Sequence, residues 1–229
     1  MKRKMLISIH LLKGLVLSLV TTLFFSCEKN DIDESGSFNI KVVNASPGTL
    51  AQGFTLANQV LVNGGLNFTD ASNYINTSSG KRLVAEFKNE GTNSVTATGE
   101  LYTINGVSFT VYLAGQGSSS RVKAYEDDLA VPNNGKVKIK FIHLSDAAPS
   151  DIYIKNGAGD DLVTNISRNI QSGYKYVDPG TLSFKLYGTA SRNNIGNFDI
   201  PDLQSGKIYT LYLTGSTDAT LAINKVLHN

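Results

Sequence analysis

The sequence predicts an all-β protein built from two tandem immunoglobulin-like β-sandwich domains of similar topology. Three observations lead to this prediction. The chain repeats itself at a period of about 100 residues, longer than a solenoid unit and large enough for a domain with its own core. Apolar residues alternate with polar ones, as in half-buried strands. Turn-forming residues recur about every 8–12 residues, the spacing typical of a sandwich.

The repeat consists of three collinear blocks. Residues 106–115 (GVSFTVYLAG) align with residues 206–215 (GKIYTLYLTG), and residues 39–46 align with residues 138–145. A third block, around Tyr74 in the first copy, lies between them. Because the blocks keep their order and nearly constant spacing, each copy is predicted to be one domain.

The domain boundaries follow from the repeat and from turn-forming residues. We place the first sandwich at residues 36–130, the second at residues 136–229 and a short linker at residues 131–135 (VPNNG). About 95 residues accommodate about seven strands and can fold without disulfides. No stretch of either copy holds a helical period over ten residues.

A late strand of each copy shows the alternation most clearly. Phe109, Val111 and Leu113 alternate with Ser, Thr and Tyr, and residues 208–213 repeat this pattern. Side chains of a strand point alternately to opposite faces, so one face of each strand is predicted to lie in a core and the other to point outward.

The N-terminus has the features of a bacterial lipoprotein signal. Three basic residues at positions 2–4 precede an apolar run from Gly14 to Phe25, which is too short to span a bilayer. The chain's only cysteine, Cys27, follows Ser26 in a segment that resembles a loose lipobox. We therefore predict a signal peptide at residues 1–26, lipidation of Cys27 and no disulfide in the mature chain.

The polar segment behind the cysteine is predicted to be a flexible tether over residues 27–35. Its acidic residues resemble the surface-export signal of Bacteroidetes lipoproteins, and a spacer without an addressing role fits the same composition.

Net charge argues against nucleic acid as a partner. The chain carries 21 basic and 19 acidic residues, but four of the basic residues and none of the acidic ones lie within residues 1–26. The mature chain keeps 17 basic and 19 acidic residues, a formal charge of −2, and no basic stripe that could follow a phosphate backbone.

Few residues are suited to catalysis, so we predict that the chain is not an enzyme. Only His143 and His228 remain after the signal, and His228 is expected to fray at the penultimate position. His143, Ser145 and Asp146 are too close in sequence to form a triad. We expect His143 and Ser145 to bond backbone groups and Asp146 to form an Asx-turn.

No metal or cofactor is predicted. The carboxylate runs at residues 126–128 and 159–161 lack the spaced pattern of a calcium loop, so we interpret them as solvated loop charges. Zinc would need histidines and cysteines at fixed spacings that the mature chain does not have. Tryptophan is absent, which weakens the case for a carbohydrate platform, although ten tyrosines are present.

The segment from His143 to Tyr153 (HLSDAAPSDIY) resembles the opening motif of domain-of-unknown-function family 4397, a family of exported bacterial proteins. Members carry H-A-S-P-D-A-P and then D-V-Y, later a tyrosine before a P-G turn, and G-x-x-Y-T on a late strand. The first copy keeps Asn44-Ala-Ser-Pro47, with asparagine where the family has histidine. The resemblance implies β-sandwich repeats and no established activity. The motif residues, for which we expect structural roles, are His143, Ser145, Asp146, Pro149, Asp151, Tyr174, Pro179, Gly180, Tyr209 and Thr210.

Together these features predict a lipid-anchored binding or adhesion module of the outer membrane, at the cell surface or on the periplasmic face. Its partners would be the membrane, through the anchor, and an envelope protein or a polysaccharide. The loops at residues 156–161 and 191–197 are the predicted binding loops, because loops on a rigid sandwich carry most binding sites. The alternatives are a carboxylate-dependent hydrolase acting on an extracellular polymer and a purely structural spacer.

Overall fold

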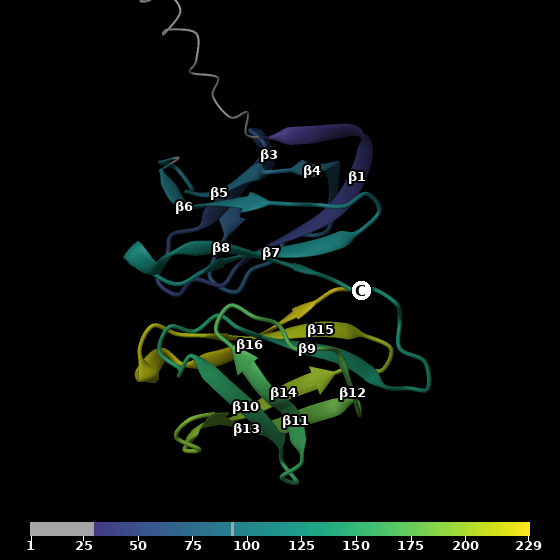
Figure 1. Ribbon diagram of the computed structural model, residues 1–229, viewed down its shortest axis with the longest axis vertical. Helices are drawn as coiled ribbons and strands as arrows, with labels where there is room; N and C mark the ends of the chain where they lie inside the picture. Colours follow the sequence, from purple (N-terminus) through teal and green to yellow (C-terminus); the bar gives the residue numbers. More distant parts are fainter. Residues whose placement is uncertain (1–29, 93) are drawn as a thin grey trace, which may run out of the picture.

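The computed structural model describes residues 30–92 and 94–229, and almost all regular structure within them is β-strand (Figure 1). The first copy contains eight strands and one 3₁₀ turn: β1 (Asp31–Asn44), β2 (Gln52–Leu56), β3 (Gln59–Leu66), β4 (Ile75–Lys81), β5 (Leu83–Asn89), β6 (Val95–Leu101), β7 (Ser108–Ala114), η1 (Gly117–Ser119) and β8 (Arg121–Glu126). The second copy repeats this order: β9 (Val137–His143), β10 (Asp151–Asn156), β11 (Asp161–Ser167), β12 (Lys175–Val177), β13 (Gly180–Gly188), β14 (Asn194–Leu203), β15 (Ile208–Thr214), η2 (Asp218–Thr220) and β16 (Ala222–Leu227).

Each copy folds into two four-stranded sheets of the same topology. The first copy forms sheet A, in the order β4-β1-β7-β8, and sheet B, in the order β3-β2-β5-β6. The second forms sheet C (β12-β9-β15-β16) and sheet D (β11-β10-β13-β14). Within sheets A and C the first and seventh strands of the copy pair in parallel, and the other pairings are antiparallel. The prediction of two tandem sandwiches of similar topology is confirmed, with eight strands in each rather than about seven.

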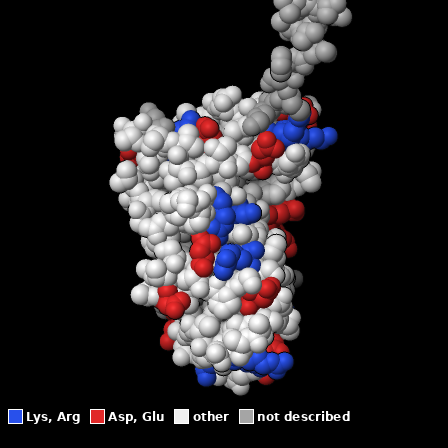
Figure 2. Space-filling model, turned by 60° about the vertical axis from the view of Figure 1, so that its left-hand side comes forward, with Lys and Arg blue, Asp and Glu red and all other residues white. Residues whose placement is uncertain are grey.

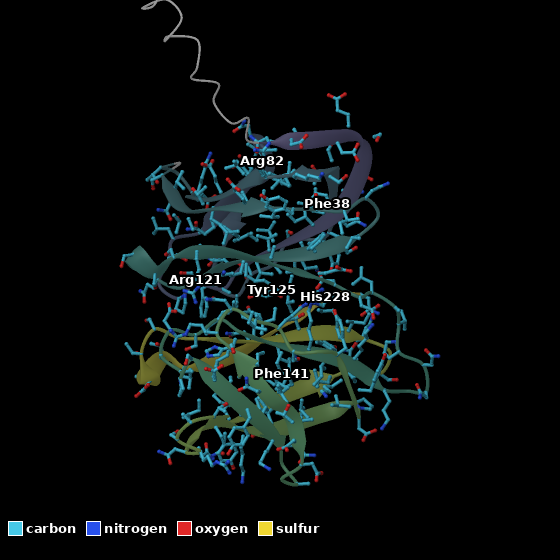
Figure 3. All side chains as sticks on the ribbon, viewed as in Figure 1. Phe38, Arg82, Arg121, Tyr125, Phe141 and His228 are labelled. Atoms are coloured by element: carbon cyan, nitrogen blue, oxygen red, sulfur yellow. The ribbon has the colours of Figure 1, made fainter. Side chains whose placement is uncertain are left out.

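Each sandwich has its own apolar core between its two sheets. Phe38, Phe54 and Phe87 are completely buried between sheets A and B. Phe141 and Phe184 occupy the corresponding space between sheets C and D, with ring centroids 5.4 Å apart. Figure 3 shows Phe38 and Phe141 inside their respective sandwiches. Alternation along the strands therefore selects the core residues as expected.

The two sandwiches stack into four layers, in the order B, A, C, D (Figure 1). Sheets A and C pack back to back through a third apolar cluster: Val43, Ala45, Tyr112, Ala114, Tyr125, Ile142, Leu144, Tyr212 and Val226. Strands β9 and β15 are consequently buried on both faces along their whole length. The outward face predicted for residues 108–113 and 208–213 is therefore an interface between the copies and not a solvent surface.

Only some of the N-terminal predictions concern residues that the structure describes. The signal peptide and Cys27 lie outside the described residues. The structure differs from the flexible tether predicted over residues 27–35, because residues 31–35 belong to β1. Asp31 pairs with Lys81 and Asp33 with Ser79 of β4, before a bulge that ends at Ser37. Backbone pairing of this kind does not depend on apolar side chains, so a polar composition did not reveal it. In the part of the chain that the structure describes, no helix has the length and apolarity needed to cross a membrane.

Candidate functional site

The first candidate is a set of polar side chains buried between sheets A and C, which we call the interdomain cluster. It lies beside the apolar cluster of the same interface, where Figure 3 shows His228. Apart from Tyr74, which is partly exposed, each member is at most 8 % exposed. Its members are Lys41, Tyr74, Thr110, Asp127, Lys140, Thr210 and His228.

The interdomain cluster has an approximate two-fold arrangement. Lys41 Nζ donates to the carbonyl oxygen of Leu227 at 3.1 Å, and Lys140 Nζ donates to that of Glu126 at 2.6 Å. Asp127 and His228 each follow the last strand of their copy, directly after these carbonyl groups. The two copies therefore approach each other with equivalent surfaces, on which an aspartate in one copy corresponds to a histidine in the other.

Asp127 is the acceptor at the centre of the cluster. Its carboxylate lies 3.0 Å from Lys140 Nζ, and it accepts hydrogen bonds from Thr110 Oγ1 at 2.6 Å and from the Tyr74 hydroxyl at 2.9 Å. Burial lowers the pKa of Lys140, and Asp127 opposes that shift. A buried charge needs such partners, because desolvation without them costs several kcal/mol.

His228 is an ordered part of this cluster, so the prediction that it frays is wrong. Its Nε2 lies 2.8 Å from Thr210 Oγ1 and its Nδ1 lies 2.7 Å from the Tyr74 hydroxyl. The Tyr74 hydroxyl donates its hydrogen bond to Asp127, so towards His228 it acts as an acceptor. The neutral imidazole therefore carries its proton on Nδ1. Burial, reinforced by Lys140 and Lys41 and opposed by Asp127, lowers the pKa of His228 to about 4.

This cluster brings a carboxylate, an imidazole and hydroxyl groups together, yet its position does not suit catalysis. Asp127 is 5 % exposed and His228 is 6 % exposed. Both are enclosed by the two sandwiches, so a substrate would have to separate sheet A from sheet C to reach them. The contacts of these residues join the two copies.

Tyr212 provides a direct test of this interface. Its ring packs against Tyr112 at 5.5 Å between centroids, and its buried hydroxyl has no hydrogen-bond partner among the described residues. Tyr125 also lies in the interface, but its hydroxyl donates to the Asn169 carbonyl oxygen at 3.0 Å. We expect Tyr212→Phe to leave stability unchanged or to raise it, and Tyr125→Phe to lower it by about 1 kcal/mol. Urea denaturation of both variants measures the difference, and a larger loss in Tyr212→Phe would contradict the description of the interface.

The motif residues at the end of β9 have the backbone-bonding roles that we expected for two of them. His143 is fully buried and its Nε2 donates to the Pro149 carbonyl oxygen at 2.8 Å, while burial lowers its pKa. Ser145 Oγ donates to the Gly215 carbonyl oxygen and accepts from the amides of Ala147 and Ala148. The corresponding Asn44 of the first copy also bonds backbone groups.

Asp146 does not form the expected Asx-turn. Both of its carboxylate oxygens lie 3.0 Å from the guanidinium of Arg121, in the first copy, and Ser119 Oγ donates to it at 2.9 Å. Arg121 also donates to Asn169 and to the Leu144 carbonyl oxygen. A planar guanidinium matches a carboxylate through two hydrogen bonds, so this pair fastens the copies together at the edge of the interface.

The remaining motif residues are distributed over the second copy and do not form one site. Tyr174 accepts a hydrogen bond from the Asp128 amide at 3.1 Å, which again links the copies. Thr210 binds His228, as described above. Tyr209 is buried in the core, and Asp151 accepts from Ser150 and Ser167. Pro179 lies between β12 and β13, where Gly180 adopts a positive φ of 115° that favours glycine.

Four carboxylates of the two runs are engaged by basic side chains or amides of the protein, whereas Glu126 is exposed. Asp128 pairs with Lys138 at 2.6 Å, next to the Asp127–Lys140 pair. Asp161 pairs with Lys155 at 3.0 Å, and Asp160 accepts from the side chain of Asn156. The interpretation as solvated charges is therefore wrong for Asp127. Over residues 30–92 and 94–229 no group of three or more His, Cys, Asp and Glu side chains is placed to hold a metal ion.

The two predicted binding loops do not form a common site. The segment at residues 156–161 joins β10 to β11. Of the loop predicted at residues 191–197, only residues 191–193 precede β14, and residues 194–197 belong to that strand. β10 and β13 are antiparallel, with Asn156 opposite Phe184 and Ile152 opposite Gly188. The two loops therefore lie at opposite ends of sheet D.

A second candidate lies between those ends, on the outward side of sheet D, which we call the distal face. Ile152, Ile154 and Leu186 point into the core, so the alternating Tyr153 and Tyr187 point outward. They are directly paired across β10 and β13, and their rings stack with centroids 4.9 Å apart at an interplanar angle of 9°. Sequence reasoning could assign each tyrosine to the outward side, but not the register that pairs them.

The fold and these surfaces define an all-β tandem-repeat protein in which two sandwiches form one body with a free distal face. The chain belongs to the family described as a domain of unknown function (DUF4397), whose model matches residues 38–153. The match covers the first sandwich from within β1 and ends inside β10. No curated protein matches the chain.

Several solved structures show limited similarity to this chain. The C-terminal domain of AlgF from P. aeruginosa is 21% identical, with a TM-score of 0.30 over 41% of this chain and 99% of that one. A CBM26 module of Eubacterium rectale Amy13K in complex with maltoheptaose is 12% identical (TM-score 0.29; 83% and 97% covered). A putative cell adhesion protein from Bacteroides uniformis is 11% identical (TM-score 0.29; 85% and 99% covered). Because each TM-score is below 0.5, we infer the function from the residues of this chain.

Proposed function

We propose that this protein is a non-catalytic, lipid-anchored module of the bacterial cell envelope that presents a binding surface on its second sandwich. The observation that supports this most is that the start of β1 and sheet D lie at opposite ends of the molecule. In Figure 1 the start of β1 lies at one end of the long axis, and sheet D lies at the other. An anchor that precedes β1 would hold the first sandwich towards the membrane and leave the distal face pointing away from it.

The interface between the copies supports this role, because presentation needs a rigid support. The Arg121–Asp146 and Asp127–Lys140 pairs and the Tyr125 hydrogen bond join sheet A or its flanking segments to the second copy. The apolar cluster around Tyr112 and Tyr212 adds a buried surface between them. Neighbouring domains that share only a small polar interface move relative to each other. The interface between these two sandwiches instead contains a buried apolar cluster, which favours a fixed arrangement.

The anchor itself is proposed from the sequence. A basic start, a short apolar run and Cys27 behind a small residue support lipidation of that cysteine and placement in the outer membrane, at the cell surface or on its periplasmic face. The partners in this proposal are the membrane, through the lipid, and an envelope protein or polysaccharide.

The anchor is tested by Cys27→Ser in the native host. We expect the wild-type protein to sediment with membranes and its N-terminal peptide to carry the mass of a diacylglyceryl group. The Cys27→Ser protein is expected to lack this mass and to shift towards the soluble fraction, because the thiol that would carry the lipid is gone. A wild-type protein with an unmodified cysteine in the soluble fraction would contradict the proposal.

Binding is distinguished from the spacer and hydrolase alternatives by two further measurements. The purified full chain is expected to retain a partner from envelope extract or from a glycan array, and to release no product from a panel of polysaccharides and esters. Failure to bind in either assay favours the spacer. Turnover that disappears on replacing one carboxylate favours the hydrolase.

A further inference from the structure

We propose that the distal face binds an uncharged oligosaccharide, with the stacked pair Tyr153 and Tyr187 as the platform for its sugar rings. This inference rests on the proposed function and names the ligand class and the residues of the binding surface.

The tyrosine pair is flanked by amide side chains on both sides of the sheet. Asn194 is directly opposite Tyr187 on β14, and its side chain donates to Asn197 at 2.8 Å. Asn165 lies on β11, on the other side of β10, and accepts from Thr189 at 2.9 Å. These three asparagines are exposed, so each keeps donor or acceptor capacity for a ligand.

The first copy lacks this arrangement at the equivalent position. Gly53 and Lys88 form the corresponding pair across β2 and β5. A Cβ atom at Gly53 would lie 2.9 Å from the Val62 carbonyl oxygen, so a tyrosine does not fit there without a backbone shift. Because the first copy reaches the same topology without the aromatic pair, the fold does not require Tyr153 and Tyr187.

The charges of the distal face favour an uncharged ligand. Lys155 pairs with Asp161, Asp151 accepts from Ser150 and Ser167, and Asp199 accepts from Ser183, while the exposed Lys185 opposite Lys155 adds a further cation. On the side of the molecule that Figure 2 displays, acidic and basic side chains lie next to each other. Such a surface does not attract phosphates or anionic lipids, which require clustered cations.

An oligosaccharide matches both parts of this surface. The faces of a pyranose ring expose C–H groups that pack on an aromatic ring, and each tyrosine keeps for such contact the ring face that its stacked partner does not cover. The hydroxyl groups at the edge of the sugar need donors and acceptors in the plane of the sheet, which amide side chains supply. An amide, two tyrosines and another amide therefore follow one another across the strands of sheet D. A linear glycan that lies across the strands would meet aromatic rings in the middle and amides on both sides.

The test measures Kd of the full chain, purified in detergent, for hexasaccharides of β-1,4-glucan, α-1,4-glucan, β-1,4-xylan and β-1,4-mannan, with oligogalacturonate as a charged comparison. We expect binding of at least one uncharged hexasaccharide. Tyr153→Ala and Tyr187→Ala should each weaken it at least ten-fold, and Tyr187→Phe should retain most of it. Tyr102→Ala and Tyr176→Ala are the matched controls, since these tyrosines are 62% and 61% exposed elsewhere and should leave Kd unchanged. Asn197→Ala, at an exposed position, is a second variant of the site and should weaken binding at least three-fold without affecting folding.

Each outcome bears on the inference. Binding that is unaffected by Tyr153→Ala, Tyr187→Ala and Asn197→Ala would overturn it, as would a preference for oligogalacturonate. If no hexasaccharide binds while the chain still sediments with membranes and retains an envelope protein, the glycan inference fails and the proposed function stands. If retention of that envelope protein is lost in the tyrosine variants, the distal face binds protein and the inference is again wrong.

Discussion

Replacing Asp127 by asparagine is expected to lower the free energy of unfolding by about 3–5 kcal/mol, the largest effect we expect from a single polar substitution in this protein. The variant removes the carboxylate that lies 3.0 Å from Lys140 Nζ and that accepts hydrogen bonds from Thr110 and Tyr74. Lys140 would then be a buried cation without a counter-charge. Removing one partner of a buried pair leaves the other desolvated, which is why the loss is large.

Asp178→Asn is the matched control for this prediction. Asp178 pairs with Lys136 at 2.6 Å, which is shorter than the Asp127–Lys140 distance, but its side chain is 83% exposed. Water screens this pair and solvates the lysine after the substitution, so the loss is expected to stay below about 1 kcal/mol. Urea denaturation at neutral pH compares the two variants. Equal losses would show that the short distance, and not burial, determines the contribution of these pairs.

The second large effect is the dependence of stability on pH that His228 produces. Its pKa is lowered to about 4 in the folded protein, mainly by burial, and is about 6.5 in the unfolded chain. Between these values the unfolded chain binds a proton that the folded protein does not, so stability is fully present above pH 6.5 and falls as the pH falls towards 4. His228 alone is expected to remove about 2 kcal/mol between pH 7 and pH 5.

His228→Gln is expected to remove this part of the pH dependence while keeping a polar side chain beside Thr210. The buried His143 also has a lowered pKa and acts in the same direction. His143→Asn, which introduces the residue of the first copy, therefore serves as the comparison. Urea denaturation between pH 5 and pH 7 gives the slopes, and an unchanged slope in His228→Gln would mean that His228 is not buried in its neutral form.

The sequence predicted the tandem sandwiches because the signals for them are local and repeated. Residues 106–115 and 206–215 alternate in the same way and occupy equivalent strands, β7 and β15. Alternation assigns side chains to one face or the other, but it does not tell what covers each face. Thr110 and Tyr112 were assigned correctly to the side away from their own core, and only the structure shows that this side contacts the second copy.

The candidate sites depended on long-range pairing, which the sequence does not record. Lys41 and Lys140 have the spacing of outward residues, and nothing in the pattern distinguishes a lysine facing water from one facing Asp127 across an interface. Proximity to the C-terminus suggested that His228 would fray, whereas hydrogen bonds with Thr210 of its own copy and Tyr74 of the first copy hold it. Tyr153 on β10 and Tyr187 on β13 are far apart in the sequence, with β11 and β12 between them. Their stacking depends on the register between β10 and β13, which alternation does not predict.

The approximate two-fold arrangement between sheets A and C has a consequence for how the copies recognise each other. Equivalent surfaces make three pairings conceivable: first with first, second with second, and first with second. In a pairing of two second copies, each Lys140 would face a His228 and no carboxylate, leaving two buried cations uncompensated. The single exchange of aspartate for histidine thus disfavours self-association of the second sandwich, so that this sandwich depends on its covalent neighbour to neutralise its lysine.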